Sequence, residues 1–335
     1  IVITGATSGI GLSTARAAAA RGARLVLAAR NEQALKTVAH DLTSKGAQVE
    51  PVVADVGVQT DVERIALAAA KRFGGFDTWI NNAGVTIFGE IDQVSITDHR
   101  RLFETNYWGV VYGSLAALDH LKRRPGGGAI INVGDMLGDA PAPMQGAYSA
   151  SKHAVHGFTS ALRMELMRDK TPVSVTLVRP GAIDTPHKDN ARSYQDAPWR
   201  NPGPVYAAPL AAQAILYAAG HPVRQMNIGG LAGGVTFLSR LLAPLSEPIM
   251  AWLLPRLSRD DSGMSGPKPP SNLHAPGQDL RERAWYPNVR EQSLATAAQM
   301  RPAATAGVVA GVAALAIACF LVGRKLRDER DPPEA

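Results

Sequence analysis

Cysteine is almost absent from this chain of 335 residues, which contains only Cys319. One cysteine cannot form an intrachain disulfide, and this scarcity fits a reducing compartment. The chain also lacks a long block of lysine and arginine, although its formal net charge is +6. Scattered basic residues are typical of a solvated surface, so the sequence predicts no nucleic-acid partner. It contains no internal repeat and no cluster that predicts a metal site.

Residues 1–228 alternate short β-branched runs with longer alanine-rich helical stretches, and apolar residues make up 46% of the chain. This alternation predicts an α/β fold of the Rossmann type, in which helices cover both faces of a doubly wound parallel sheet. About seven strands are expected, close to the usual sheet size. We place them at residues 1–3, 24–28, 49–53, 78–80, 129–133, 173–178 and 225–228.

Two regions of different composition follow this domain. Residues 229–255 are crowded with large apolar side chains. They are expected to form an apolar helical extension, which either packs on the main domain or acts as a lid over a lipophilic substrate or a surface that touches membrane. Residues 256–302 are rich in proline, glycine, serine and charge, which predicts a linker.

The end of the chain contains residues 303–322, which have no charge and no proline. Twenty helical residues rise about 30 Å, close to the hydrocarbon thickness of a bilayer. We therefore predict a single transmembrane helix over 303–323 and a charged tail over 324–335; a buried or oligomerising helix is the alternative. Gly307 and Gly311 have the spacing of paired membrane helices.

A glycine-rich loop directly follows the first expected strand. Gly5 permits a tight turn, while Gly9 and Gly11 allow close approach of the backbone to a pyrophosphate and of the next helix to the sheet. The helix N-terminus would present free N–H groups and its positive dipole end to the phosphates. The sequence thus predicts a dinucleotide site, whose loop contacts are Gly5, Thr7, Ser8, Gly9, Ile10 and Gly11.

The end of the second expected strand indicates which dinucleotide binds. A carboxylate there would bind the ribose 2′-hydroxyl and repel a 2′-phosphate. The strand instead ends in alanines followed by Arg30, a good phosphate ligand. We therefore predict NADP(H) rather than NAD(H). Further cofactor contacts are expected after the third and fourth strands, from Asp55, Val56, Asn82, Ala83 and Gly84.

Tyr148 and Lys152 lie four residues apart in an expected helix and therefore share one face. The ordinary pKa of tyrosine is about 10. A nearby ammonium and the positive nicotinamide would favour the phenolate. Tyr148 could then exchange a proton with a substrate oxygen while hydride moves to or from the nicotinamide.

Together these motifs resemble the classical short-chain dehydrogenase/reductase family, across residues 1 to about 230. The resemblance rests on the glycine loop, residues 81–84, Asn106, the pair Tyr148 and Lys152, and residues 180–185, which occur in the family's order and spacing. The apolar region and the terminal span are similar to those of membrane-associated members.

The resemblance implies an alcohol or carbonyl oxidoreductase that uses a nicotinamide cofactor and forms a dimer or tetramer. In such enzymes the residues matching Tyr148 and Lys152 carry acid–base chemistry, and the one matching Asn106 holds a water of a proton relay. The residue matching Thr185 contacts the nicotinamide amide. The implied cofactor contacts also include Tyr148, Lys152, Pro180 and Gly181.

Asp135 departs from the family pattern, in which a serine at this position holds the substrate oxygen. An ionised aspartate cannot donate a hydrogen bond to a carbonyl. Two like charges about 4 Å apart cost about 4 kcal/mol at an effective dielectric of 20, so ionised Asp135 would oppose a Tyr148 phenolate. Three outcomes stay open: Asp135 is protonated and donates as serine would; it points away and Asn106 with water takes over; or the enzyme is slow or inactive and the fold serves binding.

The sequence therefore supports two functions. The first is an NADP(H)-dependent oxidoreductase that is anchored in a membrane and acts on a lipophilic substrate. The second is a catalytically weak or inactive NADP(H)-binding membrane protein that serves as a sensor or scaffold. A sugar-nucleotide epimerase fits poorly, because the glycine spacing and residues 81–84 match the classical branch.

Two features of the sequence disagree about the side of the membrane on which the catalytic domain lies. NADPH and the lone cysteine favour a cytoplasmic catalytic domain, whereas the basic residues after the span favour a cytoplasmic tail. We give more weight to the cofactor, because the tail also carries acidic residues.

Overall fold

The computed structural model describes residues 1–195, 201, 203–230, 243–258, 271–277, 280–307 and 310. At its centre is a parallel seven-stranded sheet in the order β11-β7-β6-β4-β1-β2-β3. The Rossmann-type sheet expected from the sequence is therefore confirmed. Its strands are β1 (Val2–Thr4), β2 (Leu25–Ala29), β3 (Val49–Val53), β4 (Thr78–Asn81), β6 (Gly128–Val133), β7 (Val173–Pro180) and β11 (Gln225–Ile228).

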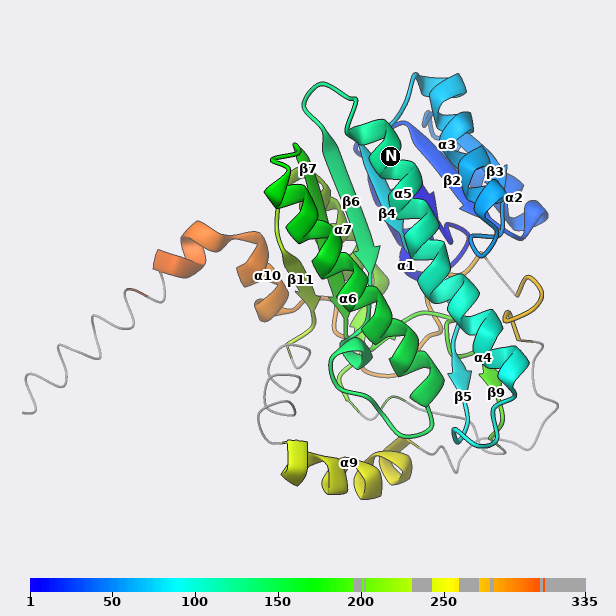
Figure 1. The fold of residues 1–335 in the computed structure, drawn as a ribbon, viewed down its shortest axis with the longest axis vertical. Coiled ribbons are helices and arrows are strands. Elements are labelled where there is room, and N and C mark those ends of the chain that lie inside the picture. Colours follow the sequence, from blue (N-terminus) through cyan, green and yellow to red (C-terminus); the bar gives the residue numbers. More distant parts are fainter. Residues whose placement is uncertain are drawn as a thin grey trace, which may run out of the picture.

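Helices cover both faces of this sheet, as Figure 1 shows. Helices α1 (Gly9–Ala19), α2 (Glu32–Ser44) and α7 (Ala208–Gly220) pack on one face, with Leu12 and Ile215 fully buried. The other face is covered by α3 (Gln59–Phe73), α5 (Gly109–Leu121) and α6 (Gly146–Arg168). Burial on both faces explains why the central strands are continuous apolar runs instead of alternating patterns.

Shorter elements extend the carboxyl edge of the sheet. Helix α4 (Ile96–Phe103) continues through a π-helical turn at Glu104–Trp108 into α5, and a 3-10 turn spans Met136–Gly138. Two small parallel pairs join β5 (Ile87–Phe88) to β9 (Arg192–Ser193) and β8 (Ile183–Asp184) to β10 (Tyr206–Ala207). These elements build walls above the strand ends, where ligands bind in open α/β sheets.

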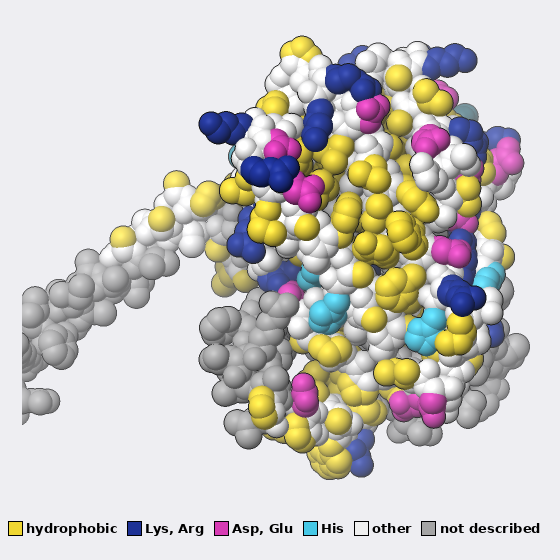
Figure 2. Space-filling model, viewed as in Figure 1, with side chains coloured by type: hydrophobic (Ala, Val, Ile, Leu, Met, Phe, Trp, Pro, Cys, Tyr) yellow, Lys and Arg dark blue, Asp and Glu magenta, His cyan; other side chains and the backbone are white. Residues whose placement is uncertain are grey.

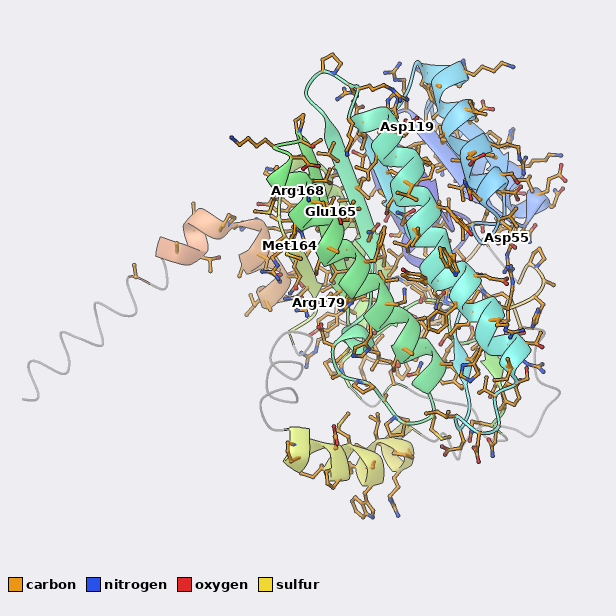
Figure 3. The ribbon with its side chains drawn as sticks, in the orientation of Figure 1. Asp55, Asp119, Met164, Glu165, Arg168 and Arg179 are labelled. Carbon is orange, nitrogen blue, oxygen red and sulfur yellow. The ribbon has the colours of Figure 1, made fainter. Side chains whose placement is uncertain are left out.

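An apolar surface runs along α5 and α6. Leu115 on α5 and Met164 and Met167 on α6 are exposed, and Figure 2 shows apolar side chains gathered over these two helices. Figure 3 shows charged Glu165 and Arg168 beside Met164. An apolar strip with a charged border has the composition of an interaction surface.

The region after the sheet differs from its expected form. Helix α9 (Ala243–Ser258) carries Ile249 and Trp252 as exposed side chains, while Leu253 and Leu254 are half-buried, so this part of the apolar extension is only partly buried. Residues 271–277 and 280–300 fall in the stretch interpreted as a linker, but they lie against the domain. Leu273 is completely buried, and α10 (Leu294–Met300) packs on β11. Backbone hydrogen bonds to distant residues hold this stretch despite its polar composition.

Within the described residues, no helix is long and apolar enough to cross a bilayer. Residues 308–309 and 311–335, which include most of the predicted transmembrane helix and the charged tail, lie outside the described part of the chain. Residues 231–242 of the apolar extension also lie outside it.

Candidate active site

The glycine loop connects β1 to α1 at the carboxyl edge of the sheet. Gly5 and Gly9 have φ values of +65° and +52°, a region that favours glycine. A Cβ on Gly11 would lie 2.1 Å from the Gly5 carbonyl oxygen, so a side chain there would collide with the loop. The Cβ position of Gly9 is 3.1 Å from Cβ of Thr185, which brings Thr185 against the loop although 176 residues separate them.

The predicted cofactor residues largely converge on one cleft. Asn82 helps to shape it, because its side-chain amide donates to the carbonyl oxygens of Thr4 at 2.9 Å and Gly5 at 3.2 Å. Ile10 lies in the first turn of α1, while Gly181 follows β7 and donates its N–H to the Ile228 carbonyl. The cleft itself is lined by Gly5, Thr7, Ser8, Arg30, Asp55, Val56, Ala83, Gly84 and, unexpectedly, Asn272, Pro276 and Gly277.

The predicted catalytic pair adjoins this cleft through Lys152. Helix α6 carries Tyr148 and Lys152, and the Lys152 ammonium is 5.6 Å from the centre of the Tyr148 ring. The same ammonium donates to the Val133 carbonyl oxygen at 3.0 Å and lies 3.8 Å from the Cβ position of Gly84, which lines the cleft. Burial lowers the pKa of Lys152 to about 8.

Asp135 points toward Tyr148. The tyrosine hydroxyl donates to Asp135 Oδ2 at 2.9 Å, while Oδ1 accepts the Leu137 N–H at 2.8 Å. The second bond makes Asp135 the N-cap of the 3-10 turn, a position that aspartate favours. Of the three outcomes left open by the sequence, the one in which Asp135 points away does not match this arrangement.

Burial is the main influence on the pKa values of Asp135 and Tyr148. It raises the pKa of Asp135, although the Leu137 N–H and the Lys152 charge act in the opposite direction. Burial and the adjacent Asp135 raise the pKa of Tyr148 well above its ordinary value. The tyrosine of this site therefore keeps its proton at neutral pH.

Asn106 lies in the π-helical turn, and its side chain is completely buried. Its Oδ1 accepts the Val85 N–H and its Nδ2 donates to the Val85 carbonyl, each at 2.9 Å, and Nδ2 also donates to Ser151 Oγ at 3.1 Å. These bonds fix the chain after β4 against the helix that carries Tyr148. Asn106 thus holds the backbone in place beside the catalytic pair.

His187 is a site residue that the sequence reasoning missed. The centre of its ring is 6.0 Å from that of Tyr148, and its Nε2 is buried without a hydrogen-bond partner in the described structure. Burial, assisted by the Lys152 charge, lowers the pKa of His187 to about 4, so the imidazole is neutral at pH 7. Its place two residues after Thr185 was the one signal in the sequence.

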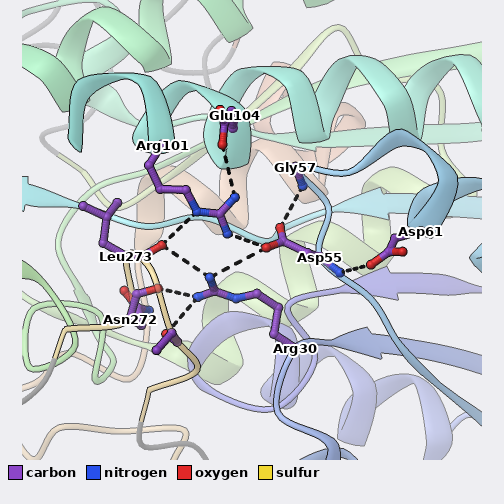
Figure 4. Close-up of polar contacts among 9 residues, drawn as sticks. Arg30, Asp55, Gly57, Asp61, Arg101, Glu104, Asn272 and Leu273 are labelled. Carbon is purple, nitrogen blue, oxygen red and sulfur yellow. Dashed lines mark hydrogen bonds and ion pairs between the residues drawn. The ribbon is translucent and has the colours of Figure 1, made fainter. Parts of the chain in front are cut away.

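The second feature missed is a strap, which we define as residues 271–277 together with Leu280 and Arg281. Its carbonyl oxygens accept hydrogen bonds from Arg30, as Figure 4 shows. The Gly9 N–H donates to the Arg281 carbonyl at 2.9 Å, and the Leu280 N–H donates to the Thr7 carbonyl at 2.8 Å. No periodic pattern in the sequence marks these contacts.

The profile of the short-chain dehydrogenase family matches residues 1–196. The chain belongs to this family. An uncharacterised oxidoreductase of Bacillus subtilis strain 168, YxnA, is 45% identical over 320 residues, which cover 95% of this chain and 90% of that protein. This short-chain dehydrogenase is thus an oxidoreductase, and its relatives support a dehydrogenase or reductase acting on CH–OH groups of small molecules.

Solved relatives bind either nicotinamide dinucleotide. A short-chain dehydrogenase/reductase from Burkholderia phymatum in complex with NAD has a TM-score of 0.66 and 28% identity, covering 73% of this chain and 94% of that one. An alcohol dehydrogenase from the archaeon Thermococcus sibiricus, complexed with 5-hydroxy-NADP, has a TM-score of 0.59 and 28% identity, covering 68% and 94%. One of these two solved relatives is thus bound to NAD and the other to a derivative of NADP.

Proposed function

We propose that this short-chain dehydrogenase interconverts an alcohol and a carbonyl group on a lipophilic small molecule with NADP(H), and that Asp135 slows the reaction. The main support for this proposal is the position of Lys152. Its ammonium is close both to the Tyr148 ring and to Gly84 of the cleft. A proton donor and a cofactor site therefore adjoin each other, as hydride transfer coupled to proton transfer requires.

The residues of the cleft fit a dinucleotide. The glycine loop leaves no room for a Cβ at Gly11, and α1 begins there with its positive dipole end toward the cleft. Strand β2 ends in Ala29 and is followed by Arg30 and Asn31, so no carboxylate stands at the end of the strand, which supports NADP(H) over NAD(H). Thr185, next to Gly9, is suited to hold the nicotinamide amide. A nicotinamide cofactor bound by these residues would supply or accept the hydride.

The raised pKa of Tyr148 keeps the phenol protonated, as carbonyl reduction requires, although it also makes the phenol a weaker proton donor. A protonated phenol is a general acid, and it donates its proton to the oxygen that becomes the alcohol. Charged Lys152 then stabilises the phenolate. A neutral Asp135, toward which burial acts, would donate a hydrogen bond to the same oxygen, whereas the slowing that we propose requires the ionised carboxylate. An ionised Asp135 instead holds the phenol proton and opposes its transfer.

A turnover screen tests this function. Oxidation of NADPH and of NADH is followed by the loss of their near-ultraviolet absorbance, with 4-nitrobenzaldehyde, decanal and a steroid ketone as substrates. We expect turnover with NADPH, and a loss of about 10²- to 10⁴-fold in Tyr148→Phe, the range for general acid catalysis. NADPH affinity, measured by fluorescence, should fall far less than turnover in that variant. Equal turnover by Tyr148→Phe would reject the proposed role of the phenol.

A second function, an NADP(H)-binding sensor or scaffold, is favoured by the hydrogen bond between Tyr148 and Asp135, which occupies the catalytic proton. The two functions differ in one outcome. Affinity for NADPH without turnover of any probe, even in Asp135→Ser, would support the binding protein. Turnover in either form would support the enzyme.

We further propose membrane attachment and self-association. The exposed Ile249 and Trp252 of α9 support contact with lipid or a lipophilic substrate, and the uncharged sequence of 303–322 supports an anchor. We assign the catalytic domain to the cytoplasm because NADPH is the cofactor that we propose for it. Flotation with lipid vesicles should be lost after deletion of 303–335. The apolar surface of α5 and α6 supports a homo-oligomer, which light scattering would detect.

A further inference from the structure

We propose that Arg101 joins Arg30 in binding the 2′-phosphate of NADP(H), and that backbone carbonyls of the strap compete with this phosphate. The inference rests on the proposed use of NADP(H). It assigns a specificity role to α4, which precedes the catalytic residues, and to a stretch whose composition is that of a linker.

One oxygen atom contacts both arginines. The Leu273 carbonyl accepts Nε–H of Arg101 at 3.1 Å and Nη1–H of Arg30 at 3.4 Å. The two guanidinium groups also approach the same carboxylate oxygen, Asp55 Oδ2, as Figure 4 shows. Both arginine side chains are mostly buried, with 20% of Arg30 and 15% of Arg101 exposed. The position of the Leu273 oxygen marks where a phosphate oxygen can bridge the two cations.

Two arginine cations face this position, and both contact one carboxylate. Asp55 is the carboxylate shared by both arginines, whereas Glu104 contacts Arg101 at 3.4 Å and is half exposed. The other acceptors of Arg30 on the strap are the neutral carbonyls of Asn272 and Ala275. A phosphate monoester carries about −1.5 to −2 charges at pH 7. Charge-assisted bonds to arginine are stronger than bonds to neutral carbonyls, so the phosphate can displace them.

Two side chains hold the strap over the arginines. Leu273 is fully buried in an apolar cluster with Ile87, Leu102 and Tyr148. His274 Nε2 lies 2.7 Å from Oδ1 of Asp98, a carboxylate at the start of α4. The strap, which lines the cofactor cleft through Asn272, Pro276 and Gly277, is therefore connected to α4. Displacement of the carbonyls costs part of the energy gained by phosphate binding.

Affinity for the two dinucleotides tests the role of Arg101 without any turnover. Dissociation constants for NADPH and NADH are measured by calorimetry on the full chain, with Arg101→Gln and, as a matched control, Arg100→Gln, an exposed neighbour on α4. We expect Arg101→Gln to weaken NADPH binding about 10- to 100-fold, as for loss of a charged hydrogen bond. The dissociation constant for NADH should change less than about twofold, and Arg100→Gln should change neither dissociation constant.

Parallel weakening of both dinucleotides in Arg101→Gln would overturn the inference, because it would indicate a structural role through Asp55. Unchanged NADPH affinity would overturn it as well. If the unmodified chain binds neither dinucleotide, or prefers NADH, the proposed use of NADP(H) is rejected, and the inference about Arg101 is rejected with it. Preference for NADPH that survives in Arg101→Gln rejects only the role of Arg101.

Competition by the strap has its own measurement. Leu273→Ala and the milder His274→Ala should loosen the strap and tighten NADPH binding by about threefold or more, a change that calorimetry resolves. The cofactor-induced rise in melting temperature serves as a second readout that also reports folding. Weaker or unchanged NADPH binding in folded His274→Ala would overturn the competition.

Discussion

The Tyr148 hydroxyl donates a hydrogen bond to Asp135 Oδ2 at 2.9 Å, within the helix–turn arrangement that would otherwise present this phenol to a substrate. The bond stabilises the protonated phenol, and burial together with Asp135 raises the pKa of Tyr148 well above its ordinary value. A less acidic phenol is a weaker proton donor to a carbonyl oxygen. The chemistry of this site therefore depends on the charge of one carboxyl group.

Replacement of that carboxyl should accelerate carbonyl reduction. Asp135→Ser provides a neutral hydroxyl donor and removes the negative charge, and we expect kcat/KM with NADPH at pH 7 to rise about tenfold or more, equivalent to about 1.4 kcal/mol. Asp135→Asn is the matched control for charge, because it keeps the size and removes only the charge. If neither variant is faster than the parent, Asp135 is not an obstacle to turnover.

The pH dependence of reduction should report Lys152, whose pKa burial lowers to about 8. Below this pH the ammonium is charged and supports the phenolate formed in the reaction; above it the charge is lost. We expect log kcat/KM to fall above pH 8, because this parameter reports the free enzyme. In Lys152→Arg the side chain stays charged. An identical decline in both proteins would assign it to another group.

Acid sensitivity of the fold should depend on His187, whose pKa is lowered to about 4. Between pH 6.5, the ordinary pKa of histidine, and about pH 4, the unfolded chain binds more protons at this position than the folded chain does. The stability that neutral His187 contributes is therefore present at neutral pH and is lost as the pH falls. At pH 5 the loss from this group is about 2 kcal/mol. Urea unfolding at pH 7 and 5 should show a smaller loss in His187→Gln. The exposed His40→Gln is the control, and equal losses in all three proteins would contradict the prediction.

Two helical glycines should respond oppositely to alanine. A Cβ on Gly157, exposed in α6, meets nothing within 4 Å, so Gly157→Ala should raise the free energy of unfolding by about 0.5–1 kcal/mol. A Cβ on Gly113, in α5, would lie 2.0 Å from Asn81 Oδ1, and Gly113→Ala should lower stability by about 1–3 kcal/mol. Urea unfolding measures both. Stabilisation by Gly113→Ala would show that α5 can move away from β4.

The sequence by itself determined the sheet, the glycine loop and the spacing of Tyr148 and Lys152, because each follows from a local repeat. Apolar runs separated by helical stretches specify a parallel sheet, and a four-residue spacing on a helix brings two side chains to one face. The family pattern of these motifs also identified Asp135 as the unusual residue. These features depend on neighbours in the chain.

Only the tertiary structure decided that Asp135 faces Tyr148, that His187 reaches the same site, and that the strap contacts Arg30 and Arg101. The strap contacts join residues more than 170 positions apart and mostly use backbone carbonyl oxygens. Every residue carries such an oxygen, so its use as a partner leaves no trace in residue type or periodicity. The proline- and glycine-rich composition of this stretch predicted a linker, because composition reflects only how much apolar surface a segment can bury by itself. It does not report the contacts that the segment makes with distant residues of the fold.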